Sequence, residues 1–385
     1  MKLNSAPLWA AAFRPFFLLG IPCGLAVMAV AFATPQVSFD RLWHGHEMVF
    51  GFAGAIVSGI VLTALPSWAG TPEIKGRRLA LLVALWLAGR VALALPASPL
   101  LPQWLTAGID CALFPAMAAM LAPQLARVPN RWYLLALPGL LALAIANLVF
   151  HLGLIAGDAV RQSLGLHLAV YVLLVLYILK SGVFIPVFTS NELAGRSPAI
   201  KRHVGLEVAA VLAIVALGWM DLGGWPRAWV GGVGLAAFAI NAVRLARWQG
   251  WRVAAAPLVF GLHLGIAFLV LALALRAAAA FTPLVPAEAW LHAFTVGGIG
   301  LCMIMLLPRV ALRHTGRPLL LPPAMRLAYA AMLVAAALRL ACSFIVASWP
   351  AERLLQASAL AWVASFALYL WLFAPMFWRP SLPRS

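Results

Sequence analysis

Apolar stretches of about twenty residues recur along the chain, and they constrain its fold more than any other feature. A helix of that length spans the hydrocarbon core of a bilayer, because it rises about 1.5 Å per residue. Twelve such stretches occur, at residues 13–33, 47–66, 79–96, 103–122, 132–154, 163–188, 203–222, 228–247, 256–280, 289–311, 325–347 and 354–377. They predict an all-α polytopic membrane protein with twelve transmembrane helices.

Composition supports a membrane protein and argues against a nucleic-acid-binding one. The chain is 65% hydrophobic and 10% charged, whereas soluble domains are about 25% charged. Its net charge of +17 comes from arginines and lysines in short groups between the apolar stretches. They form no basic face with interleaved aromatic residues, so we expect the lipid bilayer as a partner and no nucleic acid.

The loops alternate in charge, which predicts the topology. One set contains Lys75, Arg77 and Arg78; Arg127 and Arg131; Arg196, Lys201 and Arg202; Arg244, Arg247 and Arg252; Arg309, Arg313 and Arg317. Basic loops stay in the cytoplasm, so both termini are expected there. Ala31-Phe32-Ala33 resembles a signal-peptide cleavage site, and cleavage would leave eleven spans. Arg14-Pro15 interrupts the preceding run, which favours a retained first helix.

An internal repeat is visible when the sequence is shifted by 246 residues (292 − 46 = 246). HEMVFGFAG from His46 then aligns with HAFTVGGIG from His292, with a histidine and two glycines in common. His167 lies at the start of the sixth expected helix. The second, sixth and tenth helices end in similar segments: LPSWAGTP, IPVFTSNELAGRSP and LPRVALRHTGRP. We therefore expect three parallel four-helix repeats around a pseudo-threefold axis, at residues 1–126, 127–250 and 251–385 of one membrane domain.

The repeat gives three histidines equivalent positions at the outer ends of their helices. Ionisable groups inside membrane spans are costly, so they mark functional positions. We expect His46, His167 and His292 to converge on one metal centre in the outer leaflet, with His44 beside it. The alternative is that each histidine caps a helix or lies at the headgroup level.

Other polar residues are predicted in the same half of the membrane. Arg90 and Arg339 occupy equivalent places in two repeats. We expect them to neutralise an anion such as the carboxylate of a bound ligand, with Glu47 and Asp110 contributing to cofactor binding. The alternative is a structural Arg90–Asp110 ion pair. His263, about seven residues into its helix, is a further candidate metal ligand.

Several histidines and two arginines in apolar surroundings suit a redox metal. Imidazole binds copper, zinc and iron, and haem also requires an apolar slot and cations for its propionates. Zinc alone would leave the arginines unexplained. The four cysteines lie inside spans without a CxxC or CxxCH motif, so we expect neither disulfides nor covalently attached haem. A proton-coupled transporter could use the same histidines and carboxylates.

Five motifs carry a resemblance to a known family: FRPFF at 13–17, HGHEMVFGF at 44–52, IPVFTSN at 185–191, HAFTVGGIG at 292–300 and RVALRHTGRP at 309–318. They resemble the NnrS family, and they are spread over nearly the whole chain. Members of that family are polytopic membrane proteins associated with haem and copper in bacteria that meet nitric oxide. The chain departs from the family pattern at Val183, where an arginine is common.

The resemblance implies a protein of the bacterial inner membrane that binds copper and non-covalent, b-type haem. It also implies a role in denitrification and in the response to nitric oxide and nitrosative stress. Nitric oxide or a related small molecule would be its ligand. Catalysis, sensing and carriage all stay open, because no quinone or cytochrome motif identifies an electron donor. Transport of a metal, haem or a small anion through the same His and Arg cluster is the alternative function.

The topology can be tested with reporter fusions placed after Arg41 and after Arg78. The two reporters should lie in opposite compartments, because one apolar stretch separates these positions and the second is in a basic loop. Alkaline phosphatase and green fluorescent protein activity would report each compartment. The same compartment for both fusions would contradict the alternating topology.

Overall fold

The computed structural model describes residues 6–33, 40–194, 200–345 and 349–383. Arg196, in one of the basic loops, lies outside these ranges. The described residues form helices and no strands. Eleven of their helical segments are long and apolar enough to cross a membrane. The expectation of an all-α, multi-pass membrane protein is therefore confirmed.

The twelfth expected span falls on helix α4 (Arg77–Ala94). This segment is helical over 18 residues, but three arginines within it lower its apolar character: Arg77, Arg78 and Arg90. The first two lie at its end, where long basic side chains reach the headgroups. Arg90 is the residue that decides whether α4 can cross a membrane, and its partners are described with the site below.

The described residues divide into two compact units, which are treated separately. Unit 1 is Met1–Val172, Val310–Leu319 and Leu370–Ser385, and unit 2 is Leu173–Arg309 and Leu320–Tyr369. The boundary falls within α8 (Ala159–Glu192), α13 (Leu301–His314) and α15 (Trp349–Trp378).

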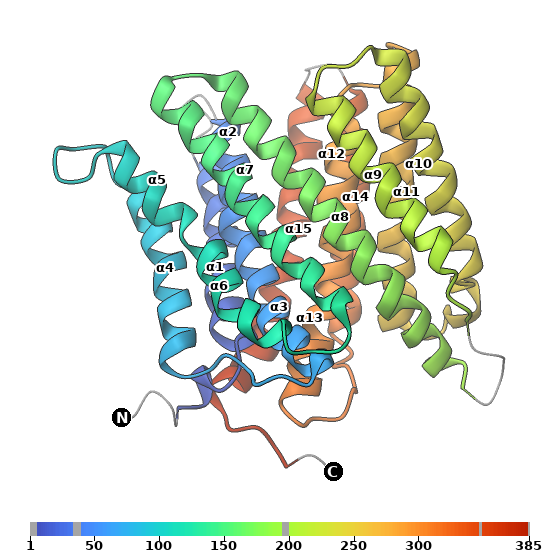
Figure 1. The fold of residues 1–385 in the computed structure, drawn as a ribbon. Coiled ribbons are helices and arrows are strands. Elements are labelled where there is room, and N and C mark those ends of the chain that lie inside the picture. The colour runs from blue at the N-terminus through green and yellow to red at the C-terminus, as the bar shows by residue number, and fades with distance from the viewer. Residues whose placement is uncertain (1–5, 34–39, 195–199, 346–348, 384–385) are drawn as a thin grey trace. The chain divides into compact units, whose positions relative to one another are not determined.

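Unit 1 brings together the helices of the first half of the chain. Its elements are η2 (Pro7–Trp9), α1 (Phe13–Ala33), α2 (Arg41–His46), η3 (Glu47–Ala53), α3 (Gly54–Ala69), α4, α5 (Gln103–Cys111), α6 (Leu113–Leu125), η4 (Arg131–Leu135) and α7 (Ala136–Ala156). Helix α1 packs along α3 and η3, and α4 lies beside α5, as Figure 1 shows. Helix α7 contacts both α5 and α6.

Unit 2 repeats part of this arrangement. Its elements are α9 (Val204–Leu222), α10 (Arg227–Arg247), η5 (Gly250–Val253), α11 (Pro257–Phe281), α12 (Ala289–His292), η6 (Ala293–Gly300) and α14 (Met325–Phe344). Helix α10 packs against α9 and α11 (Figure 1). Helix α11 contacts η6 much as α1 contacts η3 in unit 1, and α14 contacts η6 as α4 contacts η3.

The segments η3 and η6 are both π-helices, and they occupy the two positions that the sequence repeat relates. Glu47 shifted by 246 is residue 293, where η6 begins. Each π-helix follows directly on a histidine, His46 or His292. π-Helical turns are rare and are frequent at functional sites. The two segments that the sequence shift relates therefore share an uncommon local structure, while the three repeats and their threefold axis stay a prediction.

The FRPFF motif has a packing role at one end of unit 1. Arg14 is 1% exposed, and its guanidinium donates hydrogen bonds to the carbonyl oxygens of Phe377 at 3.1 Å and Arg379 at 2.7 Å, and to Ser381 Oγ at 2.8 Å. These carbonyl groups belong to the last turn of α15 and the residues after it. They therefore accept no hydrogen bond from an N–H group of the helix itself. The ring of Phe13 contacts that of Phe377 at 5.7 Å between centroids. The motif thus fastens the start of α1 to the C-terminal segment.

Replacing Arg14 by leucine should destabilise the protein by on the order of 3 kcal/mol, because buried carbonyl oxygens would lose a charged donor. The melting temperature in detergent and proteolysis of the C-terminal segment would measure the effect. Arg379→Leu is the matched control, because the side chain of Arg379 is exposed and only its backbone oxygen takes part in the contact. Equal melting temperatures for the two variants would contradict this role.

Candidate metal centre

His46 lies at the junction of α2 and η3 and is fully buried. Its Nδ1 lies 3.2 Å from Glu47 Oε1, and its Nε2 lies 2.9 Å from Asn147 Oδ1. The rings of Phe150 and Phe50 pack on the imidazole, with centroids 4.4 and 5.0 Å away. Both ring nitrogens are therefore engaged in a site from which these aromatic rings exclude water.

A group of three potential metal ligands meets at this position. His46, Asp110 and His151 each offer one ligand atom, these atoms lie within 4.8 Å of one another, and all three residues are buried. Asp110 Oδ2 is 3.1 Å from His46 Nε2 and 2.9 Å from His151 Nε2. The ligands come from α2, α5 and α7 of unit 1. Two imidazoles and a carboxylate form a donor set that suits copper, iron or zinc.

Arg90 joins the two carboxylates of the cluster. Its Nη1 pairs with Glu47 Oε1 and its Nη2 with Asp110 Oδ1. Asn147 Nδ2 donates a hydrogen bond of 2.9 Å to the other oxygen of Asp110. Each oxygen of the Asp110 carboxylate thus has partners, as a buried carboxylate requires. The Arg90–Asp110 ion pair expected as the structural alternative is present, and Glu47 extends it.

The charges of this cluster do not balance when its imidazoles are neutral. Arg90 contributes one positive charge, and Glu47 and Asp110 contribute one negative charge each, so the sum is −1 (1 − 2 = −1). A net charge buried among apolar helices is costly. A proton on one imidazole or a bound cation removes this cost. The cluster is therefore suited to hold either a proton or a metal ion.

Two glycines make room for the charged side chains. A Cβ on Gly89 of α4 would lie 3.0 Å from Asp110 Cα and would also meet the carboxylate. A Cβ on Gly51 of η3 would lie 3.0 Å from Glu47 Oε2 and 3.3 Å from Cys23 Sγ. Trp86 Nε1 donates to the Gly51 carbonyl oxygen at 3.1 Å. The helices around the cluster can approach this closely only because these two positions carry no side chain.

Comparison with known proteins gives the family. The sequence profile of the NnrS protein matches residues 7–381. The chain belongs to the NnrS family. Membership suggests a membrane protein of the nitric oxide response. Neither the curated proteins nor the solved structures include a significant match.

Four of the residues predicted from the sequence meet in this NnrS-family site: Glu47, His46, Arg90 and Asp110. His44, half-buried, lies two residues before His46 in α2. His167 of α8 is not part of the three-ligand group, and its Nδ1 lies 2.9 Å from the carbonyl oxygen of Ser163 in its own helix.

The other predicted residues lie in unit 2. His263 of α11 is buried, and its Nε2 lies 2.9 Å from Thr189 Oγ1. Arg339 of α14 donates a hydrogen bond of 3.0 Å to His292 Nε2. Because His46 and His292 belong to different units, the convergence of three imidazoles on one axis stays a prediction.

The two histidine-led π-helices differ in their acidic residues. The residue after the histidine is Glu47 in η3 and Ala293 in η6. An arginine from a following helix, Arg90 or Arg339, reaches the same turn in both. A carboxylate directly after the histidine is thus a feature of the first site.

Sequence reasoning did not select His151 as a ligand or Asn147 as a partner of His46. Both lie on α7, and their spacing of four residues places them on one face of a helix. That spacing, inside an otherwise apolar span, is the signal that could have found them. Asp110 was predicted as a cofactor-binding residue, and in the structure its carboxylate is one of the three potential ligands.

Replacing Gly89 by alanine should disturb the Arg90–Asp110 pair and lower stability, although alanine favours a helix over glycine by about 1 kcal/mol. The melting temperature in detergent is the measurement. Gly108→Ala on the neighbouring helix α5 is the matched control, because a Cβ there meets no atom within 4 Å. We expect the control to melt at or above the temperature of the unchanged protein. A Gly89→Ala variant as stable as the control would show that this close approach is not required.

Proposed function

We propose that His46, Asp110 and His151 bind a copper ion in a membrane protein of the nitric oxide response. The single observation that carries the proposal is the meeting of these three buried ligand atoms within 4.8 Å. A buried pair of imidazoles with a carboxylate is a donor set that copper accepts. His151 adds a second reason, because its buried Nδ1 has no hydrogen-bond partner among the described residues while its Nε2 faces Asp110.

The charge of the cluster supports a cation. With neutral imidazoles its charge is −1, so a monovalent copper ion would bring it to zero and a divalent ion to +1. A neutral cluster has the lowest cost inside the membrane. Copper changes readily between these two oxidation states. The bound ion would supply one-electron chemistry and a coordination position at which nitric oxide could bind.

The residues around the three ligands would position them. Glu47 holds Nδ1 of His46, as carboxylates commonly do for metal-binding histidines, while Nε2 faces both Asn147 and Asp110. Arg90 holds both carboxylates in place. The rings of Phe50 and Phe150 exclude water from the imidazole.

Haem is proposed as the second cofactor, at a different place from this cluster. Both nitrogens of His46 are engaged and two aromatic rings lie on it, so a single ion requires less rearrangement there than a macrocycle. We propose that haem instead binds beside His292 and Arg339. The imidazole of His292 would hold the haem iron, and the guanidinium of Arg339 would neutralise a haem carboxylate.

We further propose that α4 is a twelfth membrane span, with both termini in the cytoplasm of a bacterium and the protein in its inner membrane. The pairing of Arg90 with two carboxylates supports this proposal, because it removes most of the cost of a charge in α4. A count of twelve would agree with the three four-helix repeats that the sequence predicts.

A second candidate function, proton-coupled transport, follows from the same charge count. A proton shared by His46 and His151 would also neutralise the cluster, since both imidazoles contact Asp110 Oδ2. No metal would then be retained. Metal analysis separates the two candidates.

Purified protein reconstituted with copper should retain about one copper ion per chain after extensive dialysis. His151→Gln should lose it, because glutamine cannot supply an imidazole nitrogen. His167→Gln is the matched control and should retain it, because His167 lies outside the three-ligand group. Inductively coupled plasma mass spectrometry gives the copper content, and absorption and electron paramagnetic resonance spectra with and without nitric oxide give its accessibility.

The outcomes are distinct. Loss of copper in His167→Gln but not in His151→Gln would favour the convergence of His46, His167 and His292 and overturn the assignment made here. If neither the unchanged protein nor any variant retained copper, the result would favour the proton-binding alternative. A Soret band in the purified protein would show haem independently of the copper result.

A further inference from the structure

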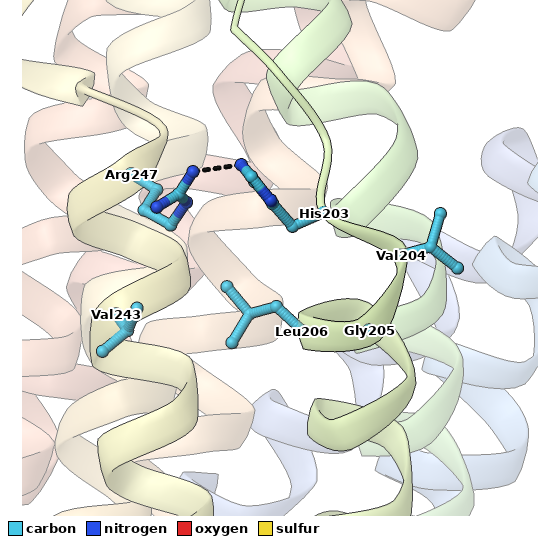
Figure 2. A pocket seen from close by; sticks show the side chains of 6 residues that line it. All are labelled: His203, Val204, Gly205, Leu206, Val243 and Arg247. Carbon is cyan, nitrogen blue, oxygen red and sulfur yellow. Dashed lines mark hydrogen bonds between the residues drawn. The ribbon is translucent and has the colours of Figure 1, made fainter.

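An open pocket lies at one end of α9 and α10 in unit 2 (Figure 2). Its volume is about 420 Å³, and it is lined by His203, Val204, Gly205, Leu206, Val243 and Arg247. Both helices are long and apolar enough to cross a membrane. The pocket contains the N-terminus of α9 and the last turn of α10. It therefore lies where two membrane-spanning segments reach the surface of the bilayer.

Two basic side chains point toward each other in this pocket. Figure 2 shows the guanidinium of Arg247 directed at the ring of His203, and Arg247 Nη2 contacts His203 Nε2. Both residues are exposed. The ion pairs of the described residues include none with Arg247. Two neighbouring nitrogen groups without a carboxylate form a suitable place for a shared anion.

The start of α9 adds backbone donors to the same pocket. The first helical hydrogen bond runs from Glu207 N to the carbonyl oxygen of His203, at 3.1 Å. The N–H groups of Val204, Gly205 and Leu206 precede it and have no acceptor within the helix. No side chain caps this end. A Cβ on Gly205 would meet no atom within 4 Å, so the space beside this residue is open.

The walls of the pocket are apolar, and this feature identifies the class of ligand. Val243 is 50% exposed and Leu206 is half-buried, and Figure 2 shows both side chains on the same side of α9 as Arg247. Lys201 and Arg202, which precede the pocket, are exposed as well. A free inorganic phosphate would gain nothing from these apolar side chains, whereas a phospholipid can place its phosphate on the basic groups and its glycerol and acyl chains on the apolar wall. Basic pockets between membrane helices are suited to acidic lipid headgroups.

We propose that this pocket binds the phosphate of an anionic phospholipid. Arg247 donates to the phosphate oxygens, and His203, whose Nε2 accepts from Arg247, donates through Nδ1. The free N–H groups of α9 complete the site, and Leu206 and Val243 contact the lipid chains. The proposal is independent of the copper site, because all of the residues that carry it lie in unit 2, whereas the three copper ligands lie in unit 1.

Native mass spectrometry of the full chain in detergent, with phosphatidylglycerol added in increasing amounts, measures the binding. Phosphatidylcholine is the zwitterionic comparison and sodium phosphate is the lipid-free one. Phosphatidylglycerol should bind at least about tenfold more tightly than phosphatidylcholine, because the site has no carboxylate to attract the choline group. Sodium phosphate at millimolar concentration should not displace the lipid.

Two pairs of variants locate the binding. Arg247→Gln should weaken phosphatidylglycerol binding about tenfold, because it removes a charged donor. Arg227→Gln, at the opposite end of the same helix, should leave it unchanged. Gly205→Leu should also weaken binding by filling the pocket, whereas Gly232→Leu should not, although a Cβ at either glycine meets no atom within 4 Å.

Three results would overturn the proposal. One is equal binding of phosphatidylglycerol and phosphatidylcholine. Another is full displacement by sodium phosphate, which would make this a site for free phosphate. The third is an equal effect of Arg247→Gln and Arg227→Gln, which would indicate a general effect of surface charge.

Discussion

The buried carboxylate of Asp110 is the group on which the arrangement of the site depends. One of its oxygens pairs with Arg90, and the other receives contacts from His46, Asn147 and His151. These partners come from α2, α4 and α7, so a single side chain fixes the approach of three helices. An ionised carboxylate in apolar surroundings is tolerated only when each oxygen has partners. Displacement of any of these helices would leave charge uncompensated.

The π-helix at η3 and two small residues make this network possible. Glu47 is the first residue of η3, so it lies directly after His46 and can reach both the imidazole and Arg90. Gly51 and Gly89 keep the space beside the two carboxylates open. Unit 2 keeps the π-helix, the histidine and the arginine of this arrangement and has Ala293 where the first site has Glu47. The shared backbone therefore carries a carboxylate directly after the histidine in η3 and a methyl group at the same place in η6.

The family motifs differ in role: one supplies residues of the candidate metal centre, and another holds helices together. HGHEMVFGF supplies His46, Glu47 and the close-packed Gly51. FRPFF supplies Arg14, whose hydrogen bonds go to backbone oxygens of the C-terminal segment, and phenylalanines that pack beside it. Similar sequence signals thus arise from different physical demands, and burial alone does not separate them, because Arg14 and His46 are both buried.

The sequence by itself determined the helical, multi-pass class, the matching segments at His46 and His292, and the selection of Glu47, Arg90 and Asp110. These conclusions depend on the length of apolar runs, on spacing along the chain, and on the cost of charge in a membrane. Only the tertiary structure decided that His151 and Asn147 contact the carboxylate of Asp110. The helices concerned are apolar on most sides, so no amphipathic pattern specifies which face turns inward. Successive side chains along a helix are rotated by about 100° around its axis, and a π-helical turn changes this rotation. The packing of whole helices therefore decides which side chains of α2, α5 and α7 meet.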